Sequence, residues 1–306
     1  MKRQVKRLQR GDTIGIIAPA SPPNEKFLNK SLEFLQELGL DYRFGDSLLN
    51  VDGYLAGTDD ERLNDLHQMF AAPDIAGIFC ACGGYGTARY ADRIDFDLIA
   101  QNPKVFWGYS DITYLHTAIG KYADIMTFHG PMLASDVGKG TFQEKSAEMF
   151  QQLFAPSILH YDDTFGPIQT FMPGQCQGEL TGGNLSLLAS SIGTPFEVET
   201  FGKILLIEDI DEEPYRVDGM LNQLRLAGKL QGVVGIIIGD FSHAEPKRKE
   251  SQTLDEVFGH YFDDLHVPIV KDVKIGHCQP HFAVPLGAHA FLDADERTFS
   301  IQPGVR

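Results

Sequence analysis

The first part of the chain alternates between short apolar runs and segments with helical periodicity. Residues 13–18 form an apolar run that predicts a strand, and apolar side chains recur at helical spacing over residues 24–38. Gly39 then stands where a helix C-cap glycine is common. Residues 58–61, Thr-Asp-Asp-Glu, fit a capping box that opens a second helix, which ends before Pro73.

The same alternation continues to about residue 122 and indicates a parallel sheet. Residues 75–82 form a continuous apolar run, as expected of a strand buried on both faces. A helix is expected after the glycines at 83–86, a strand at 105–107 and a helix at 111–122. Strands and helices in alternation with short connections predict an α/β protein with right-handed crossovers.

The second part of the chain has a different pattern of apolar and polar positions. Residues 155–178 contain prolines and glycines without strong periodicity, and we interpret them as an interdomain linker. Beyond them we expect helices at 185–192 and about 217–227, buried strands at 204–207 and 233–238, and a terminal hairpin over 288–301. The predicted organisation is an N-terminal α/β domain at residues 1–165 and a smaller C-terminal domain at 175–306.

Charge narrows the range of partners. The 306 residues include 42 acidic and 26 basic side chains, for a formal net charge of −16. This balance argues against nucleic acid or an anionic membrane as the main partner, because both select for basic surfaces. The one basic run, residues 247–249, lies among glutamates and is typical of a solvated loop.

Cysteine usage and apolar content predict a cytoplasmic protein with reduced thiols. No apolar run approaches the ~20 residues that cross a bilayer, and no apolar segment follows the basic start of the chain as in a secretory signal. Of the four cysteines, Cys80 and Cys82 lie two apart in an apolar strand. We expect them to be buried, because no second Cys or His pair has the spacing of a zinc site.

Ser110 stands between an apolar strand and a predicted helix, in the segment Trp-Gly-Tyr-Ser-Asp-Ile. A serine on such a turn has the shape of a nucleophile elbow, with the N–H of Asp111 directed at a developing oxyanion. The match to the G-x-S-x-G pattern is incomplete, because Ile112 takes the last glycine position. The local pattern also fits a serine that only caps the helix.

The Gly-Gly-Tyr-Gly loop at residues 83–86 follows a strand, at the sheet edge where ligands bind in open α/β folds. It lacks the G-x-G-x-x-G pattern and a Walker lysine, so nucleotide binding is not supported. The loop fits a plain tight turn as well as it fits an oxyanion donor beside Ser110.

A serine nucleophile needs a base and an orienting acid. His277 is the most suggestive histidine, because it follows an apolar strand and lies among turn residues. His281 and His289 are rivals, whereas His116, on the helix after Ser110, is expected to be structural. For the acid, Glu208 follows the apolar run 204–207, and its competitors are Asp209, Asp211, Glu212 and Glu213.

Taken together, these segments resemble the LD-carboxypeptidase family, which includes muramoyltetrapeptide carboxypeptidases and microcin C immunity proteins. The resemblance covers nearly the whole chain. It rests on GDTIGIIAPAS, LAGTDDERLNDLHQMFAAPDIAGIFCACGGYG, GYSDIT, FHGPM, GELTGGNLSLLASSIGTPFE, LLIEDIDEEPYRVDGMLNQLRLAG and IGHC.

The resemblance implies a catalytic triad of Ser110, Glu208 and His277, with Gly84 as an oxyanion donor beside Asp111. It also implies a flavodoxin-like or amidotransferase-like N-terminal domain, an active site at the domain junction, a homodimer, and no metal or organic cofactor. The implied reaction is hydrolysis of the L,D bond that releases terminal D-alanine from murein tetrapeptide during peptidoglycan recycling. We expect substrate contacts from Gly83, Tyr85, Asn184, Tyr215 and Arg216.

Two other functions stay open. An immunity-type hydrolase of aminoacyl-nucleotides would need an aromatic side chain for base stacking, but the single tryptophan, Trp107, lies in an apolar strand. A non-catalytic binding protein is the other alternative, and the presence of all three triad residues argues against it. Many relatives carry arginine where this chain has Cys82, which leaves the substrate preference open.

Overall fold

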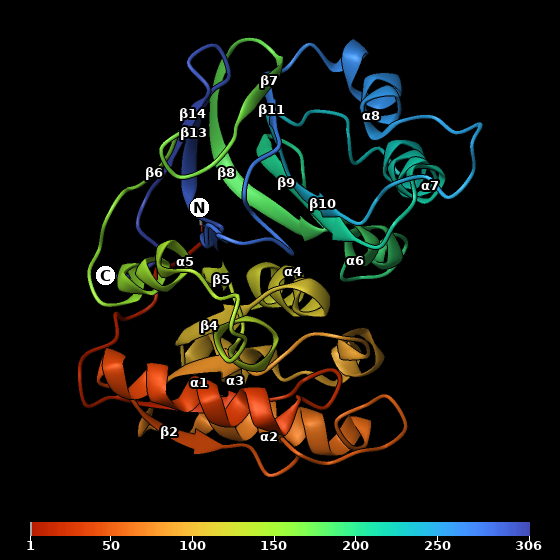
Figure 1. The fold of residues 1–306 in the computed structure, drawn as a ribbon. Helices are drawn as coiled ribbons and strands as arrows, with labels where there is room; N and C mark the ends of the chain where they lie inside the picture. The colour runs from red at the N-terminus through yellow and green to blue at the C-terminus, as the bar shows by residue number, and fades with distance from the viewer. Residues whose placement is uncertain (1) are drawn as a thin grey trace.

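The structure, a computed structural model, describes residues 2–306. Figure 1 shows two layered parts, one mostly red to yellow and the other mostly green to blue. The first contains a six-stranded sheet, to which β12 returns from the C-terminal half, and the second contains an eight-stranded sheet. Within residues 2–306, no helix is both long enough and apolar enough to cross a membrane.

The six-stranded sheet has the order β12-β5-β4-β3-β1-β2. Its first five strands in the chain pair in parallel, and β12 is antiparallel to β5. The strands are β1 (Thr13–Ile17), β2 (Asp41–Phe44), β3 (Ile75–Cys80), β4 (Val105–Gly108), β5 (Thr127–His129) and β12 (Val284–Leu286). The associated helices are α1 (Glu25–Leu38), α2 (Asp59–Ala71), α3 (Phe96–Gln101), α4 (Thr113–Tyr122) and α5 (Glu144–Glu148).

Helix boundaries in this part follow the capping signals in the sequence. The Asn24 side chain accepts a hydrogen bond from the backbone of α1, and Gly39 closes that helix with φ 75°. The reciprocal capping box between Thr58 and Glu61 opens α2, as predicted. After the glycine loop, the expected helix is present as a 3₁₀ helix, Thr87–Arg93.

The eight-stranded sheet has the order β6-β14-β13-β8-β9-β10-β11-β7. The strands β8 to β11 run parallel in the middle, and the outer pairs are antiparallel, so the sheet is mixed. The strands are β6 (Leu159–Tyr161), β7 (Gln169–Met172), β8 (Gln175–Asn184), β9 (Lys203–Ile210), β10 (Gly235–Ser242), β11 (Ile269–Lys271), β13 (His289–Asp293) and β14 (Thr298–Ile301). Its helices are α6 (Leu185–Ser191), α7 (Pro214–Leu226) and α8 (Leu254–Phe262). The predicted terminal hairpin is confirmed as β13 and β14.

The interpretation of residues 155–178 as a linker is wrong, because this segment contains β6, β7 and the start of β8. β6 and β7 are the two edge strands of the eight-stranded sheet. Edge strands are short and partly solvated, so they carry little of the apolar periodicity that marks a buried strand. β12, in turn, returns from the C-terminal half to the six-stranded sheet. The domain limits at 165 and 175 stay a prediction.

β9 is buried on both faces, and its alternation fixes the direction of the residues that follow. Ile204 and Leu206 pack in the large core that includes the six-stranded sheet. Leu205 and Ile207 pack in a second core with α7 and α8. Because successive side chains on a strand point to opposite faces, Glu208 faces the junction of the two parts.

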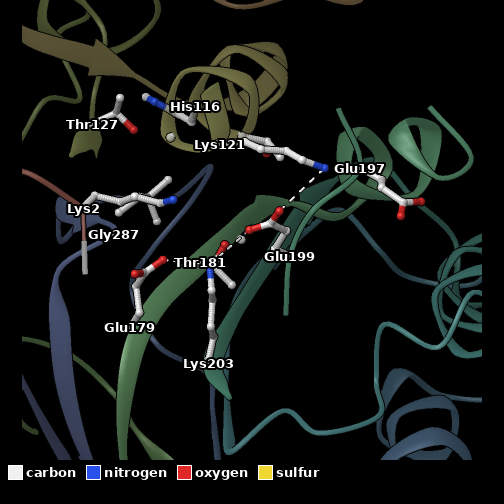
Figure 2. Close-up of a pocket in the computed structure, with 14 residues that line it drawn as sticks. Lys2, His116, Lys121, Thr127, Glu179, Thr181, Glu197, Glu199, Lys203 and Gly287 are labelled. Carbon is white, nitrogen blue, oxygen red and sulfur yellow. Dashed lines mark hydrogen bonds and ion pairs between the residues drawn. The ribbon is translucent and has the colours of Figure 1, made fainter. Parts of the chain in front are cut away.

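Figure 2 shows a small cavity of about 40 Å³ where the two parts meet. Lys121 on α4 lies 3.7 Å from Glu199, and Lys203 on β9 lies 2.8 Å from Glu179 and 3.9 Å from Glu199. These contacts form a charged cluster across the junction. Since neither Ser110 nor His277 lines this cavity, the candidate chemistry lies elsewhere.

We predict that Gly182→Ala destabilises the fold strongly. Gly182 has φ 120°, and an added Cβ would lie 2.0 Å from the Leu206 carbonyl oxygen of β9. We expect a cost of roughly 2–4 kcal/mol, measured as a lower thermal unfolding temperature. The control is Gly219→Ala in α7, where a Cβ meets nothing within 4 Å and should add about 0.5–1 kcal/mol of stability. Equal unfolding temperatures for both variants would contradict this explanation.

Candidate active site

Ser110 occupies a strained turn directly after β4. Its φ is 64°, in the left-handed region that side chains other than glycine rarely adopt. The short 3₁₀ helix Ser110–Ile112 begins at this residue and continues into α4. Among the described residues, no side chain caps this helix. The Ser110 hydroxyl instead lies 3.1 Å from Nε2 of His277, so the helix-cap interpretation does not describe it.

Glu208 lies in β9 and is fully buried at the junction. One carboxylate oxygen, Oε2, is 2.8 Å from Nδ1 of His277. Its neighbour Asp209 faces the other side of the strand, where it accepts hydrogen bonds from the Asn184 side chain and from the backbone and hydroxyl of Ser186. Of these two carboxylates, Glu208 is the one that contacts His277.

The other acidic candidates are engaged elsewhere. Glu212 pairs with Arg216 on α7. Glu213 accepts a hydrogen bond from the backbone of Lys247. Asp211 lies on the surface beside His243.

His277 lies in the irregular loop after β11. The loop passes so close to β9 that a Cβ on Gly276, which has φ 120°, would lie 2.5 Å from Oε2 of Glu208. The Ser242 hydroxyl donates to the His277 carbonyl at 3.1 Å and fixes the backbone. The ring of Tyr109 packs against the imidazole with a centroid distance of 4.8 Å.

The hydrogen-bond partners assign the imidazole tautomer. A carboxylate can only accept, so Nδ1–H of neutral His277 donates to Glu208, and Nε2 is left to accept the Ser110 proton. Burial opposes the charged imidazole, but the charge and hydrogen bond of Glu208 raise the pKa of His277 above its ordinary value. Burial alone would raise the pKa of Glu208, but His277 and His129 hold it well below its usual range.

His129 is a neighbour of this site that sequence reasoning did not single out. It ends β5 and is fully buried, with Nε2 3.6 Å from Oε1 of Glu208. Within residues 2–306, the two ring nitrogens of His129 have no hydrogen-bond partner. The same is true of Oε1 of Glu208. The register of β5 pairs His129 with Gly108 of β4, beside the turn at Ser110, and in the sequence this histidine appeared only as part of the FHGPM segment.

The rival histidines have other environments. His281 is fully buried, and burial lowers its pKa well below the ordinary value. His116 contacts the Gly108 carbonyl through Nε2 at 2.8 Å, which supports the end of β4. His289 pairs along β13 with Glu179 of β8.

Ser110 and His277 open into a cavity of about 580 Å³. Gly83 and Gly84 line the same cavity, and an added Cβ on Gly83 would lie 3.1 Å from the Ser110 hydroxyl oxygen. Cys82 also lines it, and its thiol donates to the Ser21 carbonyl at 3.0 Å.

The remaining predicted substrate contacts lie outside the lining of this cavity. Tyr85 is exposed and packs against Tyr54 with a ring distance of 5.5 Å. Asn184 is buried and caps α6. Tyr215 and Arg216 lie in the first turn of α7, and Tyr215 is exposed. Their role in substrate binding stays a prediction.

The glycine loop is fixed from two sides. Ser21 donates its N–H to the Gly83 carbonyl and accepts from the Tyr85 N–H, both at 3.2 Å. The Asp111 carboxylate accepts from the Thr87 N–H at 2.9 Å, which ties the residue after the loop to the turn at Ser110. A hydroxyl, an imidazole and a carboxylate in series beside fixed backbone donors form the arrangement of a serine hydrolase.

Comparison with known proteins agrees with this class. The chain matches the LD-carboxypeptidase N-terminal domain over residues 14–130 and the LD-carboxypeptidase C-terminal domain over residues 177–292. It is 50% identical to a "Probable murein peptide carboxypeptidase" of Bacillus subtilis, over 98% of this chain and 94% of that protein. It is 32% identical to the murein tetrapeptide carboxypeptidase of Pseudomonas aeruginosa, over 92% of this chain and 93% of that protein.

Solved structures show the same fold. The muramoyltetrapeptide carboxypeptidase from Oxalobacter formigenes matches with a TM-score of 0.84 and 27% identity, over 94% of this chain and 97% of that one. The wild-type apo form of the microcin C7 self-immunity protein MccF matches with a TM-score of 0.90 and 25% identity, over 98% of both chains. This protein therefore belongs to the LD-carboxypeptidase family, whose members are serine peptidases.

We predict that kcat/KM rises with pH through a single ionisation above the ordinary imidazole value of 6.5. Only neutral His277 can accept the serine proton, and Glu208 raises the pKa at which it becomes neutral. Activity is therefore lost as the pH falls through this raised pKa. A pH–rate profile tests this, and a flat profile from pH 5 to 9 would show that His277 is not the base.

Glu208→Gln should lower turnover by roughly 10³- to 10⁴-fold, by analogy with the acid of other triads. The loss of charge should also move the inflection of the pH profile to lower pH. Asp209→Asn is the matched control, because it removes the neighbouring charge on the opposite face and should change turnover far less. If Asp209→Asn lowers turnover more than Glu208→Gln does, the acid has been assigned to the wrong residue.

Proposed function

We propose that this protein is a murein-peptide LD-carboxypeptidase that releases the terminal D-alanine of a tetrapeptide during peptidoglycan recycling. The observation that carries the proposal is the continuous contact from Ser110 through His277 to the buried Glu208, open to the 580 Å³ cavity. The similarity to murein peptide carboxypeptidases supports the choice of substrate.

In the proposed mechanism, His277 takes the hydroxyl proton of Ser110, which attacks the carbonyl of the L,D bond. Glu208 holds the imidazole and stabilises its charged form. The N–H groups of Asp111 and Gly84 stabilise the oxyanion. Gly84 fits this role because it lines the cavity and its N–H makes no hydrogen bond to any of residues 2–306.

The second half of the reaction uses the same groups. His277 gives its proton to the departing amine of D-alanine, which leaves the tripeptide as an ester on Ser110. Water, deprotonated by His277, then hydrolyses this ester and restores the serine. Ser110 acts as the nucleophile that carries the acyl group, His277 transfers the protons, and Glu208 stabilises the charged imidazole.

A hydrolase of aminoacyl-nucleotides is the second candidate. The fold similarity to MccF favours it, and one of the matching MccF structures contains aspartyl sulfamoyl adenosine. Trp107, however, is buried and donates to the Pro131 carbonyl, so it does not provide a stacking surface. The homodimer and the cytoplasmic location expected from the sequence are part of our proposal and stay predictions.

We predict that the wild-type protein releases free D-alanine from a murein tetrapeptide and that Ser110→Ala abolishes this release, with a loss of roughly 10⁶-fold. Mass spectrometry of L-lysine and meso-diaminopimelate tetrapeptides measures the product and the preferred third residue. Aspartyl sulfamoyl adenosine serves as the competing substrate, and Ser190→Ala on α6 as the control. Activity of Ser110→Ala within tenfold of wild type would remove Ser110 from the mechanism. Cleavage of the nucleotide compound alone would favour the second candidate.

A further inference from the structure

The large cavity beside Ser110 has one cationic side chain that the mechanism does not use. Among the residues that line it, Lys139 alone is a lysine or arginine. Lys139 follows the short π-helix Leu133–Val137 and is exposed. The other ionisable residues of the lining, apart from tyrosine and cysteine, are His277 and Asp136.

The backbone of Lys139 is held in place, whereas its ammonium group forms no ion pair with the described residues, 2–306. The Lys139 N–H donates to the Asp136 carbonyl at 2.9 Å, and the Phe142 N–H donates to the Lys139 carbonyl at 3.2 Å. Within residues 2–306, Lys139 forms no ion pair. The turn therefore presents a free positive charge at the cavity.

Asp136 lines the cavity beside Lys139 and is held in place by hydrogen bonds from the protein. It accepts hydrogen bonds from the Tyr109 hydroxyl at 3.1 Å and from the Met132 N–H at 2.8 Å. Burial raises the pKa of Asp136, and the charges of Lys139 and His277 oppose this rise. The Tyr109 ring, whose hydroxyl donates to Asp136, packs against the His277 imidazole at 4.8 Å, so the turn of Asp136 and Lys139 lies on the His277 side of the cavity.

A cation on that side suits the chemistry of the reaction. His277 protonates the departing amine, and the carbon that bears this amine also bears the terminal carboxylate of the D-amino acid. A chain with a net charge of −16 repels an anionic ligand, so the carboxylate needs a local positive group. A charge-assisted hydrogen bond to an ammonium supplies both attraction and orientation.

We propose that Lys139 binds the terminal carboxylate of the substrate and so selects the last residue of a peptide over internal positions. This inference rests on the proposed function and adds the group that makes the enzyme an exopeptidase. Lys139 acts on the leaving residue, which is separate from the tripeptide that remains on Ser110.

The test combines a variant with a change in the substrate. We expect Lys139→Met to lower kcat/KM for the tetrapeptide by roughly 10- to 100-fold, as for the loss of a hydrogen bond to a charged group. The same variant should change kcat/KM for the tetrapeptide C-terminal carboxamide less than threefold, because the amide carries no charge. Lys139→Arg should keep most of the preference for the carboxylate. Lys249→Met, in an exposed loop away from the cavity, is the matched control for the loss of one charge.

The inference would be overturned if Lys139→Met lowered kcat/KM equally for both peptides, or for neither of them. Binding of the same two peptides to Ser110→Ala and to Ser110→Ala/Lys139→Met, measured by calorimetry, separates this result from a failure of the proposed function. Turnover of neither peptide by the wild type would count against the proposed function. Equal affinity of both proteins for the carboxylate peptide would count against Lys139.

Discussion

A carboxylate buried between two sheets is the constraint on which the rest of this structure depends. Glu208 has no exposed surface, and an isolated charge in such a place would be very costly. His277 compensates it with a direct hydrogen bond, and the imidazole of His129 lies beside the second oxygen. The same contact raises the pKa of His277, so the interaction that makes the buried charge tolerable also acts on the residue that we propose as the base.

Close backbone approach makes this arrangement possible. Gly276 allows the His277 loop to touch Glu208, and Gly83 allows the glycine loop to touch Ser110, because in both places a Cβ would lie within 3.1 Å of a catalytic candidate. Ser110 follows β4 of one sheet, Glu208 lies in β9 of the other sheet, and His277 lies in the loop after β11. Their geometry is therefore a property of the junction, and loosening the junction would separate the hydroxyl, the imidazole and the carboxylate.

The sequence predicted the regular parts of the fold from local signals. The caps of α1 and α2 and the buried runs of β3 and β9 each carry their information within a few residues. The edge strands β6 and β7 were missed because their pairing depends on distant strands. The same distinction applies to the site. Ser110 had a recognisable strand–turn–helix setting, but the choice of Glu208 and His277 needed the family resemblance. His129 and Lys139 became visible only when the chain was folded.

The central claim is that Ser110 carries the acyl group of the substrate, and trapping that ester tests it most directly. Wild-type protein mixed with a tetrapeptide can be quenched in acid within milliseconds and analysed by intact mass and peptide mapping. We predict an adduct with the mass of the tripeptide acyl group on the peptide that contains Ser110. D-Alanine release should accompany its formation. Turnover with no adduct, or with an adduct on another residue, would contradict the account.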